Sequence, residues 1–383
     1  MTDKIHAIST INRRRFLKRS GELLCAAAAG AWLPGCDLLC AASPKKYYLR
    51  PARYWEKAGD GSVRCLLCPN ACVIGDGEQG ACRARKNIGG ALFTLVYSRI
   101  AAMQVDPVEK KPLYHFLPGS LAFSIATAGC NMSCKFCQNW QISQSDPDEI
   151  ESFELPSQAL ASRARESGAR IVAYTYNEPT VQFEYICDSS ARARAAGLRP
   201  VIISNGYINV EPGKELAKNL DGVKIDLKAF SEDFYSRICG GGLKSVLKNL
   251  ESIHATGRWL EIVVLVIPTL NDSAGEIKKM AAWVRKNLSP DVPMHFTRFH
   301  SMYLIRNLPP TPVSTLERCR SIAAAEGIRY PYVGNVPGHR WENTYCHGCG
   351  KPLIDRSGFI VIRNRIRNGK CPSCGAAIPG VWA

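Results

Sequence analysis

Three cysteines near the middle of the chain have the spacing of a cluster-binding loop. They are Cys130, Cys134 and Cys137, and Phe136 stands directly before the last of them. Cysteine thiolates are the usual protein ligands of iron–sulfur clusters, and a [4Fe–4S] cluster has four irons to ligate. Three thiolates hold three irons and leave the fourth open for a small chelating ligand. The alternative, a structural zinc knuckle, needs a fourth ligand nearby, and the next cysteine is the distant Cys187.

Eight further cysteines fall into two groups, and clustering of this kind indicates metal binding rather than a disulfide frame. The groups are Cys65, Cys68, Cys72 and Cys82 near the amino end, and Cys346, Cys349, Cys371 and Cys374 near the carboxyl end. The second group has two CxxC pairs on either side of a strand-like run at 359–362, the pattern of a zinc ribbon with a closed tetrahedral site. The first group lies around a glycine-rich loop. Zinc is the preferred interpretation there, and an auxiliary iron–sulfur cluster is the alternative.

The amino end has the features of an export leader. Residues 12–18 (Asn-Arg-Arg-Arg-Phe-Leu-Lys) look like a twin-arginine signal, and a short apolar stretch follows at 23–33. Residues 33–36 resemble a lipoprotein cleavage site, and residues 41–43 offer a site without lipidation. We therefore expect residues 1–43 to export the protein to the periplasm or to a membrane anchor, with a cytoplasmic location as the alternative.

The charge of the chain gives little support for nucleic-acid binding. The formal net charge is +16, of which residues 1–50 carry +6 and residues 346–383 carry +5, which leaves +5 for the body. A modest excess of this kind is not the basic face that nucleic-acid binders present. With 46% hydrophobic and 21% charged residues, the composition is that of a folded protein.

The segments around and after the central cysteines alternate between strands and helices. Short apolar runs predict strands at 121–127, 169–176, 198–204, 223–228, 259–267 and 294–299, with a further one at 329–333. Helical spacing occurs between them, and Ser273 and Ser314, each followed three residues later by Glu, predict two capping boxes. Repeated β/α units imply an α/β fold with a parallel sheet.

Polar residues follow the ends of these predicted strands. They are Asn177 and Glu178, Ser204 and Asn205, Asp226 and Lys228, and His300. In parallel barrels the chemistry collects at the carboxyl ends of the strands, so these residues and the cysteine loop should share one mouth. Because side chains alternate along a strand, Asp226 and Lys228 should point to the same side.

The cysteine motif and these strand ends resemble the radical S-adenosylmethionine (SAM) superfamily, and in particular pyruvate formate-lyase activating enzymes. The resemblance implies a partial (β/α)6 barrel over 116–339, an N-terminal cysteine-rich segment at 44–115 and a zinc ribbon at 340–383. The N-terminal segment and the zinc ribbon rest on the cysteine spacing itself. The resemblance also implies that SAM chelates the open iron and is cleaved reductively to a 5′-deoxyadenosyl radical that abstracts hydrogen. Contacts to SAM would come from the polar strand-end residues and Phe136, and no protein side chain is assigned as catalytic.

Other stretches resemble the radical SAM component of the AmmeMemoRadiSam system. They are residues 67–69, 106–113, 137–140 and 332–339. This resemblance implies Memo-like and AMMECR-like partner proteins, besides an electron donor such as flavodoxin or ferredoxin. The substrate cannot be read from the sequence. The competing hypothesis is an exported, non-catalytic iron–sulfur and zinc protein that carries electrons or binds metal.

Overall fold

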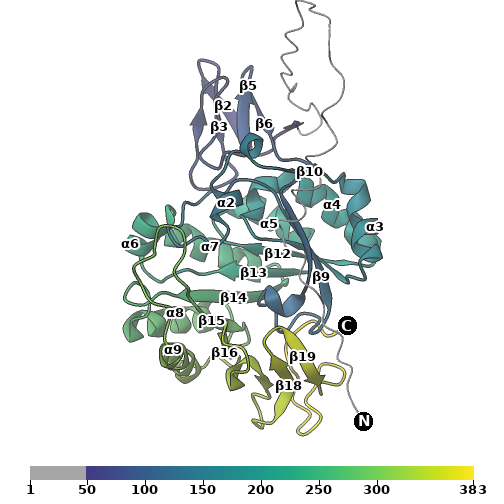
Figure 1. Ribbon diagram of the computed structural model, residues 1–383, viewed down its shortest axis with the longest axis vertical. Helices are drawn as coiled ribbons and strands as arrows, with labels where there is room; N and C mark the ends of the chain where they lie inside the picture. The colour runs from purple at the N-terminus through teal and green to yellow at the C-terminus, as the bar shows by residue number, and fades with distance from the viewer. Residues whose placement is uncertain (1–48) are drawn as a thin grey trace, which may run out of the picture. The chain divides into compact units, whose positions relative to one another are not determined.

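The computed structural model describes residues 49–383, so the predicted leader at 1–43 lies outside the described residues. An eight-stranded sheet forms the centre of this part of the chain, in the order β16-β15-β14-β13-β12-β11-β9-β8 (Figure 1). Its strands are β8 (Ala102–Pro107), β9 (Leu121–Ala126), β11 (Ile171–Tyr174), β12 (Arg199–Ser204), β13 (Gly222–Asp226), β14 (Trp259–Val266), β15 (Met294–Arg298) and β16 (Pro331–Gly334). From β9 to β16 every neighbouring pair is parallel, which confirms the α/β class.

The edge strand β8 was not expected from the sequence. It runs antiparallel to β9, with Ala102 opposite Ala126 and Pro107 opposite Leu121. A 3-10 helix, η1 (Val108–Lys110), follows it directly. Residues 106–113 therefore comprise the end of β8, which lies beside the start of β9, and the segment after it. Val108 and Leu113 in this segment are fully buried.

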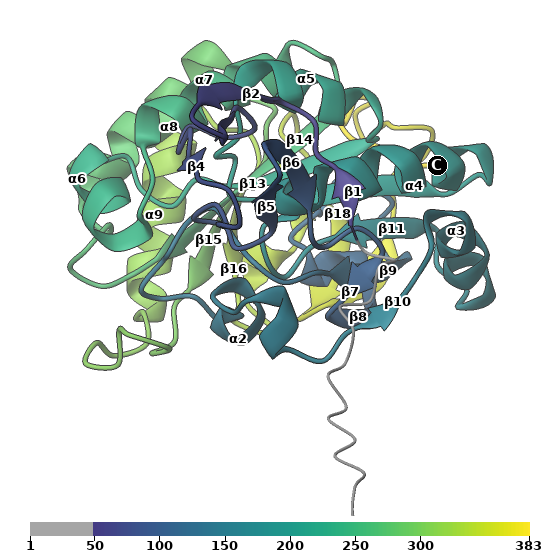
Figure 2. The ribbon, with the colours of Figure 1, turned by 90° about the horizontal axis from the view of Figure 1, so that it is seen from above.

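Helices connect the parallel strands and lie side by side along one face of the sheet (Figure 2). They are α3 (Ser157–Glu166), α4 (Phe183–Ala195), α5 (Val210–Lys218), α7 (Leu243–His254), α8 (Ala274–Asn287) and α9 (Val313–Ala325). Shorter turns are α2 (Trp140–Ser143), α6 (Glu232–Phe234), the π-helix η4 (Tyr235–Cys239), and the 3-10 helices η2 (Pro147–Glu149), η3 (Pro179–Gln182) and η5 (Arg340–Glu342). Within residues 49–383, no helix combines the length and the apolar character needed to cross a membrane.

The two predicted capping boxes have different outcomes. Ser273 is the N-cap of α8 and its hydroxyl accepts a hydrogen bond from the amide of Glu276, although the Glu276 carboxylate bonds the Phe230 amide instead. The box at Ser314 is wrong, because α9 begins at Val313 with Pro312 at its N-cap. Proline fixes its φ and directs the chain into the helix without a side-chain cap.

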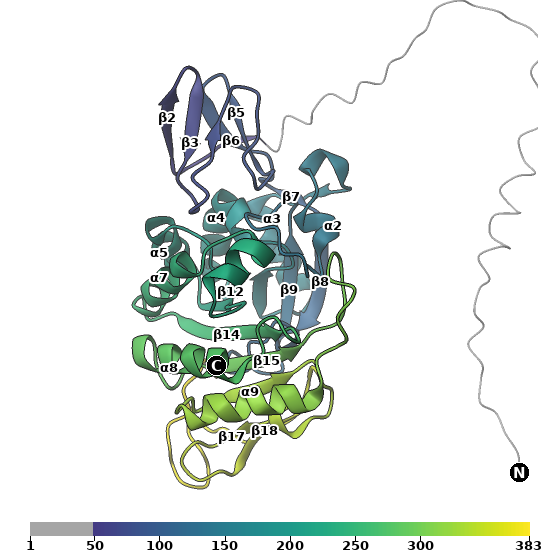
Figure 3. The ribbon, with the colours of Figure 1, turned by 90° about the vertical axis from the view of Figure 1, so that its left-hand side faces the viewer.

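Small antiparallel sheets build the segments at the two ends of the described chain. Before β8 these strands are β1 (Arg50–Pro51), β2 (Trp55–Gly59), β3 (Ser62–Cys65), β4 (Val73–Ile74), β5 (Arg85–Ile88), β6 (Ala91–Thr94) and β7 (Arg99–Ile100), the last paired with β10 (Phe153–Glu154). After β16 they are β17 (Thr344–Tyr345), β18 (Pro352–Ser357) and β19 (Ile360–Asn364), which lie beyond α9 in Figure 3.

A buried ion pair fastens the carboxyl-terminal strands to the rest of the fold. The guanidinium of Arg356 on β18 lies 3.7 Å from the carboxylate of Glu109, and both side chains are fully buried. Arg356 also donates a hydrogen bond of 2.8 Å to the carbonyl of Tyr114. Since a buried charge without its partner is costly, this contact holds the two regions together.

Candidate active site

The cysteine loop lies between β9 and α2 and is fixed by backbone hydrogen bonds to the π-helix η4. The amide of Ser133 donates to the carbonyl of Cys239 over 2.9 Å, and that of Lys135 donates to the carbonyl of Ile238 over 3.0 Å. Gly240, which follows η4, has a φ of +68°, and a Cβ there would collide with the Ser133 hydroxyl. The loop therefore packs so closely on η4 that only glycine fits at this point.

A cavity of ≈ 430 Å³ opens beside this loop at the carboxyl ends of the parallel strands. Such a volume is within the usual range for small-molecule sites. The three cysteines and seven of the expected SAM contacts line it: Cys130, Cys134, Cys137, Phe136, Asn177, Glu178, Ser204, Asn205, Asp226 and Lys228. The sheet thus brings together residues that are separated by almost one hundred positions in the sequence.

His300 is the expected site residue that the structure does not bring to this cavity. It is exposed and is not among the lining residues. Thr297, inside β15, lines the cavity at this strand instead. Just after β15, the hydroxyl of Thr311 accepts a hydrogen bond from the Phe299 amide and donates one to the Val266 carbonyl.

Glu178 ties together the ends of neighbouring strands. Its Oε1 accepts hydrogen bonds from the Thr180 amide (2.9 Å), the Thr180 hydroxyl (2.6 Å) and the Ser204 hydroxyl (2.8 Å), and its Oε2 accepts from the Asn205 amide (2.7 Å). Burial raises the pKa of Glu178, while the four donors act in the opposite direction. A carboxylate surrounded by donors is suited to the ionised form, which accepts at both oxygens.

Asp226 lies between two lysines on the floor of the cavity. Lys224 forms an ion pair with its Oδ1, and the Nζ of Lys228 lies 3.5 Å from its Oδ2. Burial opposes ionisation of Asp226, but the two lysines outweigh it and hold its pKa below the usual range. The expectation that Asp226 and Lys228 share one face is thus confirmed, and Lys224 occupies that face by the same alternation.

A second polar group, which the sequence did not assign, forms another wall of the cavity. Asp106 on β8 accepts hydrogen bonds of 2.8 Å each from Lys110, Lys111 and Tyr176. Burial works against ionisation of Asp106, but these three donors outweigh it and lower its pKa to about 2. Lys110, Lys111 and Tyr176 all line the cavity, together with Phe359 from the turn before β19.

The residues present suit a [4Fe–4S] cluster with SAM as its ligand. Three thiols face one cavity, whereas Cys239, which adjoins Cys134, is not among the lining residues. Asn177 donates a hydrogen bond of 2.8 Å to the carbonyl of Gly129, but its own buried Oδ1 has no partner. A buried acceptor of this kind is costly unless a donor satisfies it, and the ammonium group of SAM is such a donor.

The carboxyl-terminal cysteines form a compact group of metal-ligand type. All four sulfur atoms lie within 4.8 Å of one another. Two of the separations are 3.6 Å, between Cys346 and Cys374, and 3.8 Å, between Cys349 and Cys371. Cys346 and Cys349 lie between β17 and β18, Cys371 and Cys374 follow β19, and the group could bind one metal ion.

Comparison with known proteins agrees with this site. The family model for the radical SAM superfamily matches residues 124–283, which contain the cysteine loop and strands β11 to β14. The chain belongs to the radical SAM superfamily of enzymes and is related to its activating enzymes. Membership implies a [4Fe–4S] cluster and SAM, and Cys130, Cys134 and Cys137 line the cavity.

Two sequence relatives and one solved structure are among the proteins that this chain is similar to. An uncharacterized protein of Methanocaldococcus jannaschii, MJ0808, is 41% identical over 332 residues, which are 86% of this chain and 99% of that protein. A pyruvate formate-lyase-activating enzyme of Clostridium pasteurianum is 26% identical over 180 residues, 45% of this chain and 73% of that enzyme. A solved radical SAM methyltransferase of Sphaerobacter thermophilus is 16% identical, with a TM-score of 0.45 over 75% of this chain and 76% of its own.

Proposed function

We propose that this enzyme cleaves SAM reductively at a [4Fe–4S] cluster held by Cys130, Cys134 and Cys137, and uses the resulting radical to abstract hydrogen from a substrate. The observation that carries the proposal is the single cavity that the three thiols share with the polar strand ends. The cluster, when bound, supplies the electron for this cleavage. The side chains described above have the other tasks, which are binding and orientation.

The proposal gives each part of the cavity wall a role toward SAM. Asn177 offers its unpartnered Oδ1 to the ammonium group, and Glu178 fixes the strand ends that flank it. Lys228, whose Nζ lies 5.7 Å from the centre of the Phe136 ring, faces the SAM carboxylate. Ser204 and Asn205 contact the ribose and methionine parts, and Phe136 lies near the adenine. His300, being exposed, takes no part in this arrangement.

The wall made by Lys110, Lys111, Tyr176 and Phe359 is then the side from which the substrate approaches. It includes part of residues 106–113, one of the stretches that resemble the AmmeMemoRadiSam component. We therefore propose that the enzyme acts within such a system, beside Memo-like and AMMECR-like proteins and with flavodoxin or ferredoxin as electron donor.

The proposal also covers the remaining parts of the chain. The parallel strands would form a partial barrel within 116–339, the cysteine-rich segment would occupy 44–115, and residues 340–383 would form a zinc ribbon. The leader at 1–43 would direct twin-arginine export. Replacing Arg13 and Arg14 by Lys should then retain the protein in the cytoplasm, and a wholly cytoplasmic wild type would contradict the export proposal.

The decisive experiment is anaerobic reconstitution with iron, sulfide and SAM, followed by reduction and a search for 5′-deoxyadenosine. The wild type should produce it, and a variant with Cys130, Cys134 and Cys137 replaced by Ala should not. A matched control is Cys187→Ala, because Cys187 on α4 belongs to none of the three cysteine groups. Production by the triple variant would show that the cluster assignment is wrong.

A further inference from the structure

The two groups of four cysteines differ in how far apart their sulfur atoms lie. In a tetrahedral zinc site with Zn–S bonds near 2.3 Å, neighbouring sulfurs are about 3.8 Å apart. The carboxyl-terminal group has this spacing, at 3.6 and 3.8 Å. Among residues 49–383 it is the one group of three or more potential ligands whose atoms all lie within 4.8 Å of one another.

In the amino-terminal group (Cys65, Cys68, Cys72 and Cys82), no three sulfur atoms lie within 4.8 Å of one another, so this group is more widely spaced than the carboxyl-terminal one. The thiolates of a [4Fe–4S] cluster lie about 6 Å apart, because the cube of iron and sulfide stands between them. The set Cys130, Cys134 and Cys137 provides a comparison within the same chain, since it also fails the 4.8 Å limit. By this measure the amino-terminal group resembles the cluster loop and differs from the zinc-like group.

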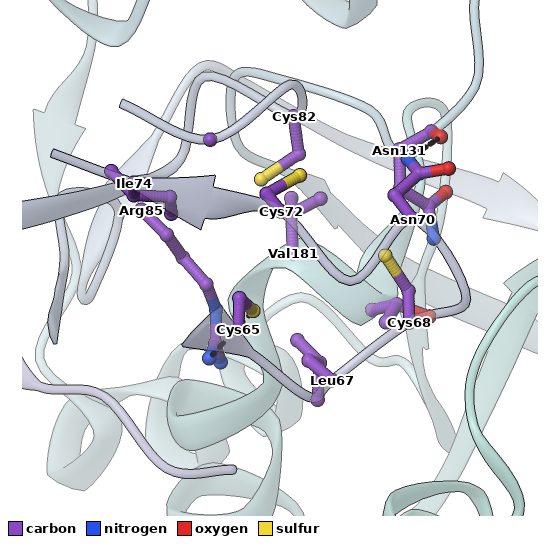
Figure 4. Close-up of a pocket in the computed structure, with 12 residues that line it drawn as sticks. Cys65, Leu67, Cys68, Asn70, Cys72, Ile74, Cys82, Arg85, Asn131 and Val181 are labelled. Carbon is purple, nitrogen blue, oxygen red and sulfur yellow. Dashed lines mark hydrogen bonds between the residues drawn. The ribbon is translucent and has the colours of Figure 1, made fainter. Parts of the chain in front are cut away.

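The four amino-terminal cysteines surround one enclosed space (Figure 4). Cys65 ends β3, and its amide donates a hydrogen bond of 2.9 Å to the carbonyl of Cys72, which closes the turn that carries Cys68. Leu67, Ile74 and Val181 complete an apolar lining. Such surroundings would shield iron and sulfide from water, since the apolar shell around a metal site controls the access of solvent.

A buried cation stands at this space. The side chain of Arg85 is 1% exposed, and its Nη1 lies 3.9 Å from the sulfur of Cys65. Nη1 and Nη2 donate to the Arg53 carbonyl and to the Glu184 carboxylate, but the buried Nε has no partner. A buried, unpartnered donor on a residue that lines this space matches a sulfur-rich anionic group, whose thiolates and sulfides accept hydrogen bonds.

The amino-terminal group also lies against the cysteine loop of the active site. The side chain of Asn70, between Cys68 and Cys72, donates a hydrogen bond of 2.8 Å to the carbonyl of Asn131, the residue after Cys130. On the other side of Cys130, Gly129 has a φ of +91°, and a Cβ there would collide with the carbonyl of Cys82. Both neighbours of Cys130 thus touch the loops that carry the amino-terminal cysteines.

We propose that Cys65, Cys68, Cys72 and Cys82 hold a second [4Fe–4S] cluster, which passes electrons to the cluster at the SAM cavity. Four thiolates leave no iron open, and the two spaces share no lining residue, so the second cluster does not bind SAM or substrate. A low-potential one-electron donor of the flavodoxin or ferredoxin class reduces it. The electron then moves to the first cluster, and the second returns to its oxidised form.

Metal analysis of the full chain tests the cluster itself, independently of the proposed function. After anaerobic reconstitution we expect about eight iron and eight sulfide per chain in the wild type, with about one zinc. The variant lacking Cys130, Cys134 and Cys137 should keep about four iron and four sulfide and, after reduction by dithionite, should show a cubane EPR signal. The control Cys187→Ala should match the wild type.

Different metal contents overturn the proposal. Two zinc ions with about four iron in the wild type would show that the amino-terminal group binds zinc. Iron without acid-labile sulfide in the triple variant, or a folded triple variant with no metal beyond one zinc, would also reject a second cluster. If the triple variant does not fold, the iron content of the wild type decides alone.

The electron transfer rests on the proposed function, so it needs a separate readout. The double variant with Cys68 and Cys72 replaced by Ala should retain the first cluster, and dithionite should reduce that cluster at the wild-type rate. Reduction by flavodoxin, followed by EPR, should be at least tenfold slower. An unchanged rate of reduction by flavodoxin would reject the electron transfer between the clusters. Failure of the wild type to cleave SAM would reject the proposed function, but the metal content would still decide whether the second cluster exists.

Discussion

Replacement of Glu178 by Gln should destabilise the fold as well as weaken SAM binding. The carboxylate accepts four hydrogen bonds from donors on η3 and at the end of β12. Gln has one oxygen, so its NH2 group must replace one of the two acceptors. At the Oε1 position it would face three donors, and at the Oε2 position it would face only the Asn205 amide. The second arrangement is the less costly one.

The size of the effect follows from this arrangement. The Asn205 amide loses its acceptor, which costs about 1–3 kcal/mol for a buried group. The three bonds that remain lose their charge assistance, and each weakens by roughly 1 kcal/mol. The neutral side chain is easier to bury, which offsets part of this loss. We expect a net loss of about 2–4 kcal/mol, a large fraction of the stability of an ordinary domain.

The assay compares urea unfolding of reconstituted proteins under anaerobic conditions. A matched control is Glu211→Gln on α5, because Glu211 is exposed and pairs only with Lys214, a contact worth about 0.5 kcal/mol or less. SAM affinity is measured by the change that SAM produces in the cluster EPR signal. If Glu178→Gln were as stable as Glu211→Gln but bound SAM weakly, the carboxylate would contact SAM directly, and the argument from the four donors would be refuted.

Three further predictions concern Arg356, His115 and Asp226. Arg356→Met should cost about 3–5 kcal/mol because it leaves the Glu109 carboxylate buried without its partner, and a loss below 1 kcal/mol in urea unfolding would contradict this. Burial lowers the pKa of His115 to about 4, so its contribution is complete above pH 6.5 and is lost as the pH falls towards 4. The shift corresponds to about 3 kcal/mol, so unfolding curves of His115→Gln should depend less on pH than those of the wild type. Asp226→Asn removes the negative charge between Lys224 and Lys228 and should weaken SAM binding by about 1–3 kcal/mol. A titration with SAM at fixed ionic strength would detect this loss. Unchanged affinity would mean that Asp226 only balances the charges of the two lysines.

The sequence predicts the strand-end residues well because a parallel sheet gathers the ends of its strands at one edge. Glu178, Asn205 and Asp226 could be found in this way without knowledge of any side-chain contact. Lys224 could have been found too, since the alternation that places Asp226 and Lys228 on one face also includes the residue two positions earlier. A lysine between Val223 and Ile225, inside a predicted apolar strand, was the sequence signal for a functional role of Lys224.

Other features depend on contacts that sequence periodicity does not encode. The strand β8 forms through its pairing with β9, and its own sequence has weak alternation. The Asp106 group requires β8 to bring its carboxylate to Tyr176, seventy positions away. His300 lies two residues beyond β15, as Lys228 lies two residues beyond β13, but His300 is exposed, so position relative to a strand end does not by itself place a side chain in the cavity.

The buried contact of Arg356 limits how the carboxyl-terminal region can be studied and exchanged. A fragment that begins near residue 340 would expose a guanidinium that is fully enclosed in the whole protein, and the remaining chain would keep Glu109 without its counter-charge. Removal of this region would also take away Phe359, which lies directly before β19 and lines the cavity beside the cysteine loop. The region is thus an integral part of the enzyme. An exchange of this region between homologues would also have to exchange Glu109 and the other partners of Arg356.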